Sequence, residues 1–363
     1  MKKKFLCYIF LFFCIFSSAF SQNNKPAVIA YYAGSAARVD SFNMNQLTHI
    51  IFSFGHLKGN RLNIDNARDT ATIRKLVAQK SKNPSLKVLL SLGGWGGCKS
   101  CSDIFSTEKG RQEFAGSVKE LLTYFNADGI DLDWEYPTIE GHPGHPYKAE
   151  DKANFTELVK TLRKKLGNNK IISFAAGGFT TFLEKSVDWP QVMKYCDFVN
   201  MMTYDLVNGA STVTGHLTPL YSTPQQKEST DNAINYLLSI GIPSEKIVLG
   251  AAFYGRLFDN VPNANNGLYQ PARFKSYVPY RSMAERLKPE DDYLFLWDDV
   301  AKAPYAYSAV KGTFITYEDS KSIALKTQYV IDKKLYGIMF WQLTEDKNNG
   351  GLLQSIDDVI NKR

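Results

Sequence analysis

Eight short apolar runs, rich in β-branched residues, recur along the chain between segments of helical periodicity. The runs are Val28–Gly34, His49–Phe54, Lys87–Trp95, Gly129–Tyr136, Lys170–Gly177, Phe198–Asp205, Lys246–Tyr254 and Leu335–Leu343. Amphipathic stretches separate most of them, among them Arg111–Phe125, Asn154–Leu166 and Thr230–Ile240. Such alternation predicts a parallel sheet built from βα units. Eight units predict an α/β fold that closes into a (β/α)8 TIM barrel.

The connection between the seventh and eighth runs is much longer than a βα loop. It covers residues 257–334 and contains its own strand-like segment, Lys311–Tyr317, and its own helix-like segment, Ser320–Ile331. We therefore predict an α+β subdomain at 257–334, inserted into a barrel formed by residues 22–256 and 335–363.

The first 21 residues have the order of a secretory signal. Three lysines after Met1 precede an apolar run, Phe5–Phe16, and small residues follow up to Ser21. The run is too short for a stable membrane anchor. Cys14 could indicate lipid attachment, but two phenylalanines precede it where small residues are expected. We expect cleavage after Ser21 and a secreted or periplasmic protein that acts as a monomer.

The charge of the chain excludes one class of partner. The formal net charge is +7, and removing Lys2, Lys3 and Lys4 with the signal leaves about +4, spread along the chain without a basic block. No nucleic-acid partner is therefore expected.

Two cysteines, Cys98 and Cys101, are separated by two residues. In an oxidising compartment they could form a short disulfide, and they could also be free thiols or half of a zinc site. Zinc needs four ligands, and neither a second cysteine pair nor a suitably spaced histidine pair is evident in the sequence. We favour the disulfide or two free thiols.

The segment Asp128–Glu135 carries an acid at every other position from Asp131 onward. Because side chains alternate along a strand, Asp131, Asp133 and Glu135 should share one face, while the apolar residues between them face the outer helices. The acids would then point toward the mouth of the barrel, where barrel active sites lie. Carboxylates about 6.6 Å apart repel by ~2.5 kcal/mol at an effective dielectric constant of 20. The cluster should therefore keep a proton near neutral pH, as a general acid requires.

These acids have two alternative interpretations. They could be buried partners of Arg or Lys, or oxygen ligands of a divalent metal. No basic residue falls on the strand, and Trp134 and Tyr136 stand where a calcium-binding loop would need glycine. We expect neither a metal nor another cofactor.

The acid cluster also bears on mechanism. A retaining glycosidase ordinarily needs a second carboxylate about 5 to 5.5 Å away across the scissile bond, and the sequence offers no obvious candidate. The substrate could supply the nucleophile instead, because the 2-acetamido carbonyl of an N-acetylhexosamine reaches its own anomeric carbon. This favours an N-acetylated sugar.

Several motifs resemble one family. Asp128-Gly-x-Asp-x-Asp-x-Glu135 resembles the signature of family 18 glycoside hydrolases, which are known for substrate-assisted catalysis. Ser91–Trp95 resembles the third-strand motif of that family, Met202–Asp205 the sixth, and Trp341 the tryptophan of the eighth. The insertion after Phe253–Arg256 is similar to the α+β domain of the chitinase branch with a deep cleft.

The resemblance implies roles for the acids. Glu135 would protonate the leaving oxygen, Asp133 would orient the attacking acetamido group, and Asp131 would tune Asp133. The substrate would be chitin or oligosaccharides of N-acetylglucosamine.

The resemblance also implies substrate contacts. Tyr204 would hold the acetamido carbonyl, Asp205 would bond the distorted sugar, and Trp341 would form an apolar floor. Barrel or core packing is the alternative for Tyr204 and Trp341. Further cleft-wall residues would be Tyr31, Phe52, Ser91, Trp95, Met202, Tyr254 and Arg256.

Three other functions share parts of this pattern. An endo-β-N-acetylglucosaminidase acting on N-glycans would use the same strand. A non-catalytic chitin-binding lectin on this fold usually lacks the glutamate, whereas Glu135 is present. A metal-dependent hydrolase would lose activity in EDTA. The leading hypothesis is an exported retaining chitinase that cleaves β-1,4 bonds.

Overall fold

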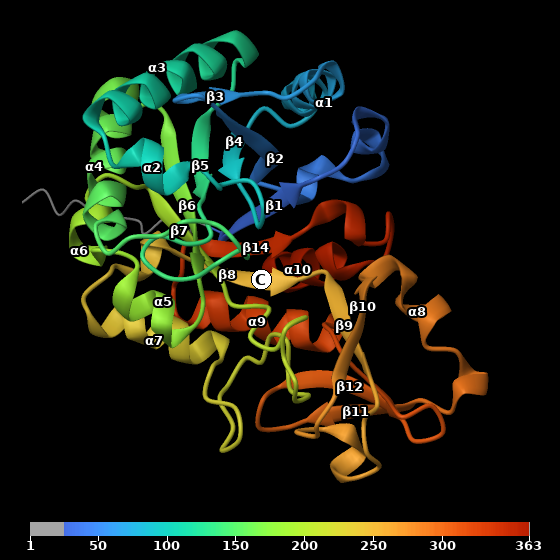
Figure 1. The fold of residues 1–363 in the computed structure, drawn as a ribbon. Coiled ribbons are helices and arrows are strands. Elements are labelled where there is room, and N and C mark those ends of the chain that lie inside the picture. The colour runs from blue at the N-terminus through green and yellow to red at the C-terminus, as the bar shows by residue number, and fades with distance from the viewer. Residues whose placement is uncertain (1–24, 363) are drawn as a thin grey trace, which may run out of the picture.

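The computed structural model describes residues 25–362, so the predicted signal segment lies outside the described residues. Eight parallel strands form a closed barrel (Figure 1). They are β1 (Ala27–Tyr32), β2 (His49–Lys58), β4 (Lys87–Gly93), β5 (Gly129–Asp133), β6 (Ile171–Gly177), β7 (Phe198–Met202), β8 (Ile247–Ala252) and β14 (Gly337–Trp341). Strand β1 closes the barrel because it pairs with β14 on one side and β2 on the other. The predicted TIM barrel is confirmed.

Helices surround the barrel strands (Figure 1). They are α1 (Ala67–Ala78), α2 (Cys101–Phe105), α3 (Glu108–Phe125), α4 (Asp151–Leu166), α5 (Thr180–Lys185), α6 (Trp189–Val192), α7 (Thr230–Ser239), α9 (Ser320–Asp332) and α10 (Leu352–Asn361). Local sequence explains their ends. The Thr107 side chain accepts a hydrogen bond from the Gly110 N–H at the start of α3, and Asn126 ends that helix in the left-handed conformation.

A second sheet of five antiparallel strands stands beside the barrel. Its order is β10-β9-β13-β12-β11. The strands are β9 (Tyr254–Asp259), β10 (Arg273–Pro279), β11 (Leu294–Asp298), β12 (Ala303–Ser308) and β13 (Thr313–Thr316), and the short helix α8 (Met283–Arg286) follows β10. Strand β9 begins at Tyr254, inside the segment that the sequence assigns to the barrel. The boundary at residue 257 stays a prediction.

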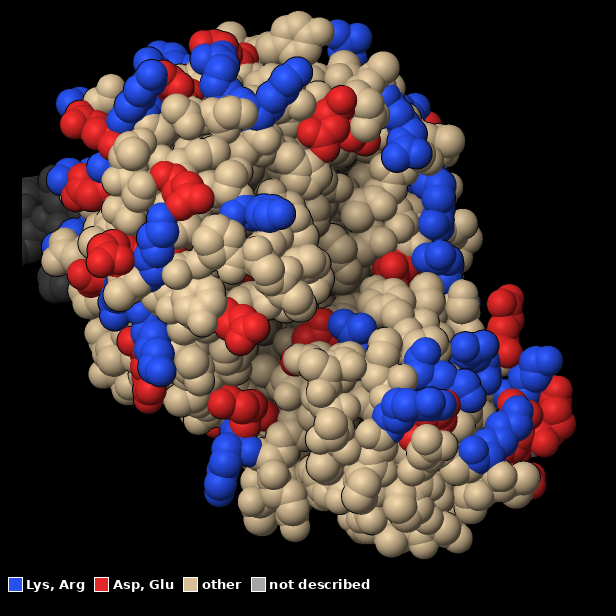
Figure 2. All heavy atoms as spheres, viewed as in Figure 1, with Lys and Arg blue, Asp and Glu red and all other residues tan. Residues whose placement is uncertain are grey.

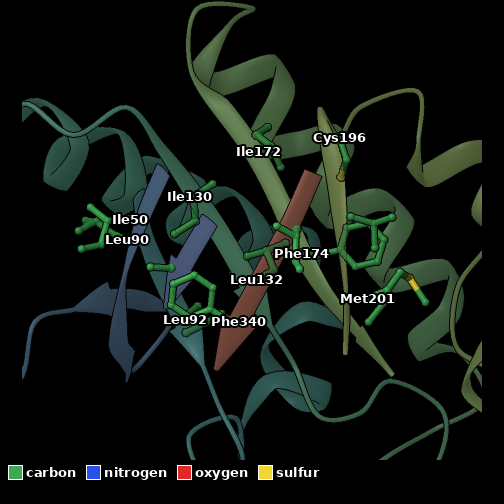
Figure 3. Packing of buried hydrophobic residues seen from close by; sticks show 14 of the residues in the cluster. Ile50, Leu90, Leu92, Ile130, Leu132, Ile172, Phe174, Cys196, Met201 and Phe340 are labelled. Carbon is green, nitrogen blue, oxygen red and sulfur yellow. The ribbon is translucent and has the colours of Figure 1, made fainter. Parts of the chain in front are cut away.

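The core has two layers because barrel side chains alternate. Outward residues pack under the helices, as Figure 3 shows for Ile130, Leu132 and Phe174. Inward residues such as Ile51 and Met339 form a smaller cluster inside the barrel. Burying one such side chain fully contributes about 1.5 to 3 kcal/mol, so the outer layer contributes most of the hydrophobic stabilisation.

Six of the eight barrel strands, among them β5, β7 and β8, end two or three residues before their predicted runs do. Strand β5 ends at Asp133, β7 at Met202 and β8 at Ala252, so the last residues of those runs are loop residues at the carboxyl ends of the strands. Conversely, β2 extends past its run and forms a hairpin with β3 (Arg61–Asn63), which the sequence did not suggest. None of the helices between residues 25 and 362 combines the length and apolar character that a bilayer crossing requires.

Candidate active site

Asp131 lies on β5 inside the barrel and is fully buried. Its carboxylate accepts hydrogen bonds from Tyr31 Oη (3.0 Å), Ser91 Oγ (2.9 Å), Ser173 Oγ (2.7 Å) and Asn200 Nδ2 (3.2 Å). Burial raises the pKa of Asp131, and these four bonds act in the opposite direction. Side chains from four other barrel strands thus fix the Asp131 carboxylate beneath the other acids.

Asp133 is the next inward residue of β5 and is also buried. Its Oδ1 has no hydrogen-bond partner among the described residues. Burial raises the pKa of Asp133 well above its ordinary value, and the charges of Glu135 and Asp131 raise it further. Asp133 and Glu135 therefore titrate together, and the pair keeps a proton at neutral pH.

Glu135 lies two residues beyond the end of β5, so the prediction that it continues the strand is wrong. Its charge nevertheless raises the pKa of Asp133. Burial raises the pKa of Glu135 to about 7, a hydrogen bond from Tyr136 lowers it, and the charge of Asp205 raises it. A carboxyl group that titrates near neutral pH can donate a proton and later accept one.

Tyr204 and Asp205 follow β7 at the same end of the barrel. Burial raises the pKa of Tyr204, as do the charges of Asp133 and Glu135, so its hydroxyl stays a proton donor. Asp205 has a left-handed backbone with φ 55°. Both of its oxygens accept hydrogen bonds from Arg256 of β9, at 2.9 Å from Nε and 2.6 Å from Nη2. The ion pair joins the barrel turn to the second sheet.

Aromatic rings line the site around Trp341, the last residue of β14. The Trp341 ring lies 5.9 Å from Tyr31 and 5.6 Å from Phe54, nearly parallel to the latter. Tyr254 stacks on Tyr277 with a centroid distance of 4.6 Å. The sequence reasoning missed Phe54 and Tyr277, because neither belongs to a motif that it used.

Trp95 stands beside the acids on the loop after β4. It is 53% exposed, which is unusual for a tryptophan. Its ring lies 6.5 Å from Tyr136, the neighbour of Glu135, and 5.6 Å from His142. The loop continues into a disulfide between Cys98 and Cys101, which decides between the alternatives left by the sequence.

The remaining candidates from the sequence occupy different layers. Ser91 bonds Asp131 as described, and Met202 lies in the inner barrel cluster. Phe52 instead packs in the outer layer, because its neighbour Ile51 takes the inward position, and the structure does not bring it to the acids. Phe54 reaches Trp341 after the β2 register shifts beyond Phe52.

The surface above the site is concave. Figure 2 shows it hollowed between the barrel and the second sheet, with acidic and basic side chains adjacent inside the hollow. Within residues 25–362, no cluster of three or more His, Cys, Asp or Glu residues could hold a metal ion. The groups at the site that can take part in chemistry include the carboxyl groups, the Tyr204 hydroxyl and the aromatic walls.

A barrel whose mouth carries a proton-holding carboxyl pair beside exposed aromatic rings defines a glycoside hydrolase. The family model described as "Glycosyl hydrolases family 18" matches residues 27–346. The chain belongs to this family, which confirms the resemblance seen in the sequence.

Relatives of known name support the assignment. Chitinase A1 of Niallia circulans is 34% identical over 300 residues, which cover 76% of this chain and 43% of that protein. Chitinase B of Serratia marcescens is 28% identical over 87% of this chain and 76% of its own length. The chain thus spans less than half of the first relative and about three quarters of the second.

Solved structures agree with the fold. A family 18 N-acetylglucosaminidase from Paenibacillus barengoltzii superposes with a TM-score of 0.85 at 36% identity, covering 92% of this chain and 99% of that chain. Chitinase ChiA74 from Bacillus thuringiensis superposes with a TM-score of 0.86 at 26% identity, covering 93% and 70%.

Proposed function

We propose that this glycoside hydrolase is an exported chitinase that cleaves β-1,4 bonds between N-acetylglucosamine units with retention of configuration. The proposal is carried by the carboxyl pair of Glu135 and Asp133, which keeps a proton at neutral pH at the mouth of the barrel. The chitinase names of the relatives support the substrate class.

In the first step, Glu135 donates its proton to the glycosidic oxygen as the bond to the leaving sugar breaks. The resulting Glu135 carboxylate is partly stabilised by the Tyr136 hydroxyl. It then accepts a proton from water, which attacks the anomeric carbon and restores the starting state.

The nucleophile of the first step is the acetamido oxygen of the substrate. Asp205, in the loop after β7, is a second carboxylate whose charge raises the pKa of Glu135, but Arg256 bonds both of its oxygens. A carboxylate held in this way is a poor nucleophile. Asp133 accepts a hydrogen bond from the acetamido N–H, and the Tyr204 hydroxyl donates one to its carbonyl oxygen.

The acid role is tested by Glu135→Gln. The amide keeps the size of the side chain but has no acidic proton, so turnover of soluble chitin oligomers should fall by at least 10³-fold. Glu140→Gln, at an exposed position nearby in the chain, is the matched control and should retain activity. Wild-type turnover in the Glu135 variant would refute the assignment.

A second candidate activity is release of single N-acetylglucosamine units, because the similar Paenibacillus structure is named an N-acetylglucosaminidase. An endo-β-N-acetylglucosaminidase acting on N-glycans is the third. Products from chitin oligomers of defined length separate the first two, since internal cleavage yields oligomers and end cleavage yields monomers. Digestion of a glycoprotein tests the third.

Export rests on the first 21 residues, whose order is that of a secretory signal. The mature protein should begin at Gln22. N-terminal sequencing of protein recovered outside the cytoplasm checks this, and an intact Met1 in that protein would contradict it.

A further inference from the structure

A hollow of about 910 Å³ lies in the insertion, away from the candidate active site. Tyrosine and other apolar side chains line it, together with Asp292, Asp319 and Lys347. None of the residues assigned to catalysis is among them. The segment from β10 through α8 to β11, which provides most of this lining, lies on the outer side of the second sheet in Figure 1.

The alternation of β9 places the hollow on the opposite face of the second sheet from the active site. Arg256 of β9 points to the active site, where it bonds Asp205. The next residue, Leu257, points to the other face and packs in one cluster with Met283 and Tyr317. Because Met283 and Tyr317 also line the hollow, the two sites are separated by the thickness of the sheet.

The walls of the hollow combine aromatic rings with exposed apolar surface. Phe295 is 63% exposed and Leu294 is 53% exposed, two of the most exposed large apolar residues of the described chain. Tyr280, Tyr293 and Tyr317 add three rings. Exposed apolar surface gathered in a concavity marks a binding site, whereas single exposed residues do not.

Polar groups in the hollow are available for a ligand. Tyr317 is 8% exposed, and its hydroxyl forms no hydrogen bond within residues 25–362. The hydroxyl stays protonated because burial and the nearby Asp319 raise its pKa. Asp292, Asp319 and Lys347 supply carboxylates and an ammonium group around the rings. The Tyr317 oxygen is not among the buried unpaired polar atoms of the described chain, so it is accessible in the hollow and can bond a ligand there.

We propose that this hollow is a second carbohydrate site, which binds a pyranose unit of an insoluble N-acetylglucosamine polymer while the active site binds another chain. Sugar rings offer apolar faces that stack on aromatic side chains, and hydroxyls that pair with carboxylates, ammonium groups and Tyr317. Charges of both signs in the lining favour a neutral ligand over a phosphate or a nucleic acid. The inference rests on the proposed function for the identity of the polymer.

A second site strengthens attachment to a solid substrate through effective concentration, without a direct effect on turnover of short soluble substrates. Removing it should therefore weaken binding to solid chitin and leave the turnover of short soluble oligomers unchanged. Damage to the active site would change both. Phe295→Ala and Tyr317→Phe are suitable, since the first changes an exposed side chain and the second removes a single oxygen. Val310→Ala, 77% exposed and outside the hollow, is the matched control.

Binding to insoluble chitin is measured in the full chain carrying Glu135→Gln, so that the solid is not consumed. Phe295→Ala should raise the concentration for half-saturation roughly three- to tenfold, and Tyr317→Phe roughly twofold or more, while Val310→Ala leaves it unchanged. With Glu135 restored, kcat/KM on soluble chitotetraose should be unchanged in all three variants.

Two results would overturn the second site. One is binding of Phe295→Ala and Tyr317→Phe to chitin as tight as that of Val310→Ala. The other is a wild-type dimer in size-exclusion chromatography that Phe295→Ala converts to monomer, because a second copy of the chain would then fill the hollow. Failure of the wild type to cleave soluble oligomers would instead overturn the proposed function.

Discussion

At the scale of single residues, the site depends on two carboxyl groups that cannot ionise independently. Asp133 is buried with one oxygen unpaired, and Glu135 lies just beyond it at the end of the strand. A negative charge on either raises the cost of a charge on the other. Burial and neighbouring charges thus keep the proton that the leaving group needs on this pair. The Asp131 carboxylate below is instead fixed in position by four hydrogen bonds.

The pKa of Glu135, about 7, predicts the basic limb of the pH profile. The acid form is present below this pKa and is lost above it, so kcat/KM, which reports the ligand-free enzyme, should fall about tenfold per pH unit above pH 7. Tyr136→Phe removes a hydrogen bond that stabilises the carboxylate and should move the limb up. Asp205→Asn removes a negative charge and should move it down, each by roughly 0.5 to 1.5 units.

The measurement is kcat/KM against pH on a soluble chitin oligomer for the wild type and both variants. The expected outcome is a basic limb that moves up in Tyr136→Phe and down in Asp205→Asn. General damage to the site would lower kcat/KM in both variants without moving the limb in opposite directions. Shifts of the same sign would contradict the assignment of Glu135 as the titrating acid.

At the scale of secondary-structure elements, the sequence predicted which segments form strands better than where they end. The run Gly129–Tyr136 alternates between apolar and acidic residues as far as Glu135, yet β5 ends at Asp133. The ladder with β6 ends at Leu132, paired with Phe174, and the chain then turns away. Strand ends depend on partners far away in the sequence, which an alternating pattern cannot reveal. Phe54 was missed for the same reason, since it reaches Trp341 through a register shift.

Helix α9 shows a second feature that no local pattern predicts. Lys326 is fully buried on this helix and pairs with the buried carboxylate of Glu318. Its ammonium group also donates to Thr218 Oγ1 (2.6 Å), and the Thr218 hydroxyl donates to the Thr203 carbonyl oxygen (2.8 Å). Because Thr203 directly precedes Tyr204, the ion pair supports the turn that carries two residues of the site.

Lys326→Met should destabilise the protein by about 3 to 5 kcal/mol, since it leaves the Glu318 carboxylate buried without its partner. Lys326→Met with Glu318→Met should recover most of the loss, because no buried charge then remains. Urea unfolding measures both, with Lys333→Met, at an exposed position just after α9, as control. A double variant no more stable than the single one would show that the pair itself is the main stabilising term.

At the scale of the whole molecule, two side chains of the loop between β7 and α7 join the barrel to the second sheet. Asp205 at the start of this loop bonds Arg256 of β9. His216, further along, is fully buried, and its Nε2 lies 2.9 Å from Asp298 Oδ2 at the end of β11. The sequence indicated an insertion from the length of the connection, from the strand-like and helix-like segments within it, and from the family resemblance. It could not indicate these contacts, since the partners are 51 and 82 residues apart.

The link between His216 and Asp298 predicts an acid-dependent term in the stability of the molecule. The pKa of Asp298 is lowered to about 2, mainly by the hydrogen bond from His216 and also by the backbone N–H groups of Ala301 and Val300, while burial acts in the opposite direction. A carboxyl whose folded pKa lies below its unfolded value of about 3.9 stabilises the fold above that value, and the stabilisation is lost as pH falls through the folded pKa.

His216→Gln should therefore lower the free energy of unfolding by about 1 kcal/mol at pH 7, less than the ~1.5–3 kcal/mol of charged hydrogen bonds because Asp298 is partly solvated. Between pH 5 and pH 2.5 the difference from wild type should shrink, because protonation of Asp298 removes the interaction that the variant lacks. Urea unfolding at several pH values in this range measures it. A difference in unfolding free energy that stays constant down to pH 2.5 would contradict a role for the bond to Asp298. His216 would then join the two parts of the molecule by packing against Tyr269 and Tyr305.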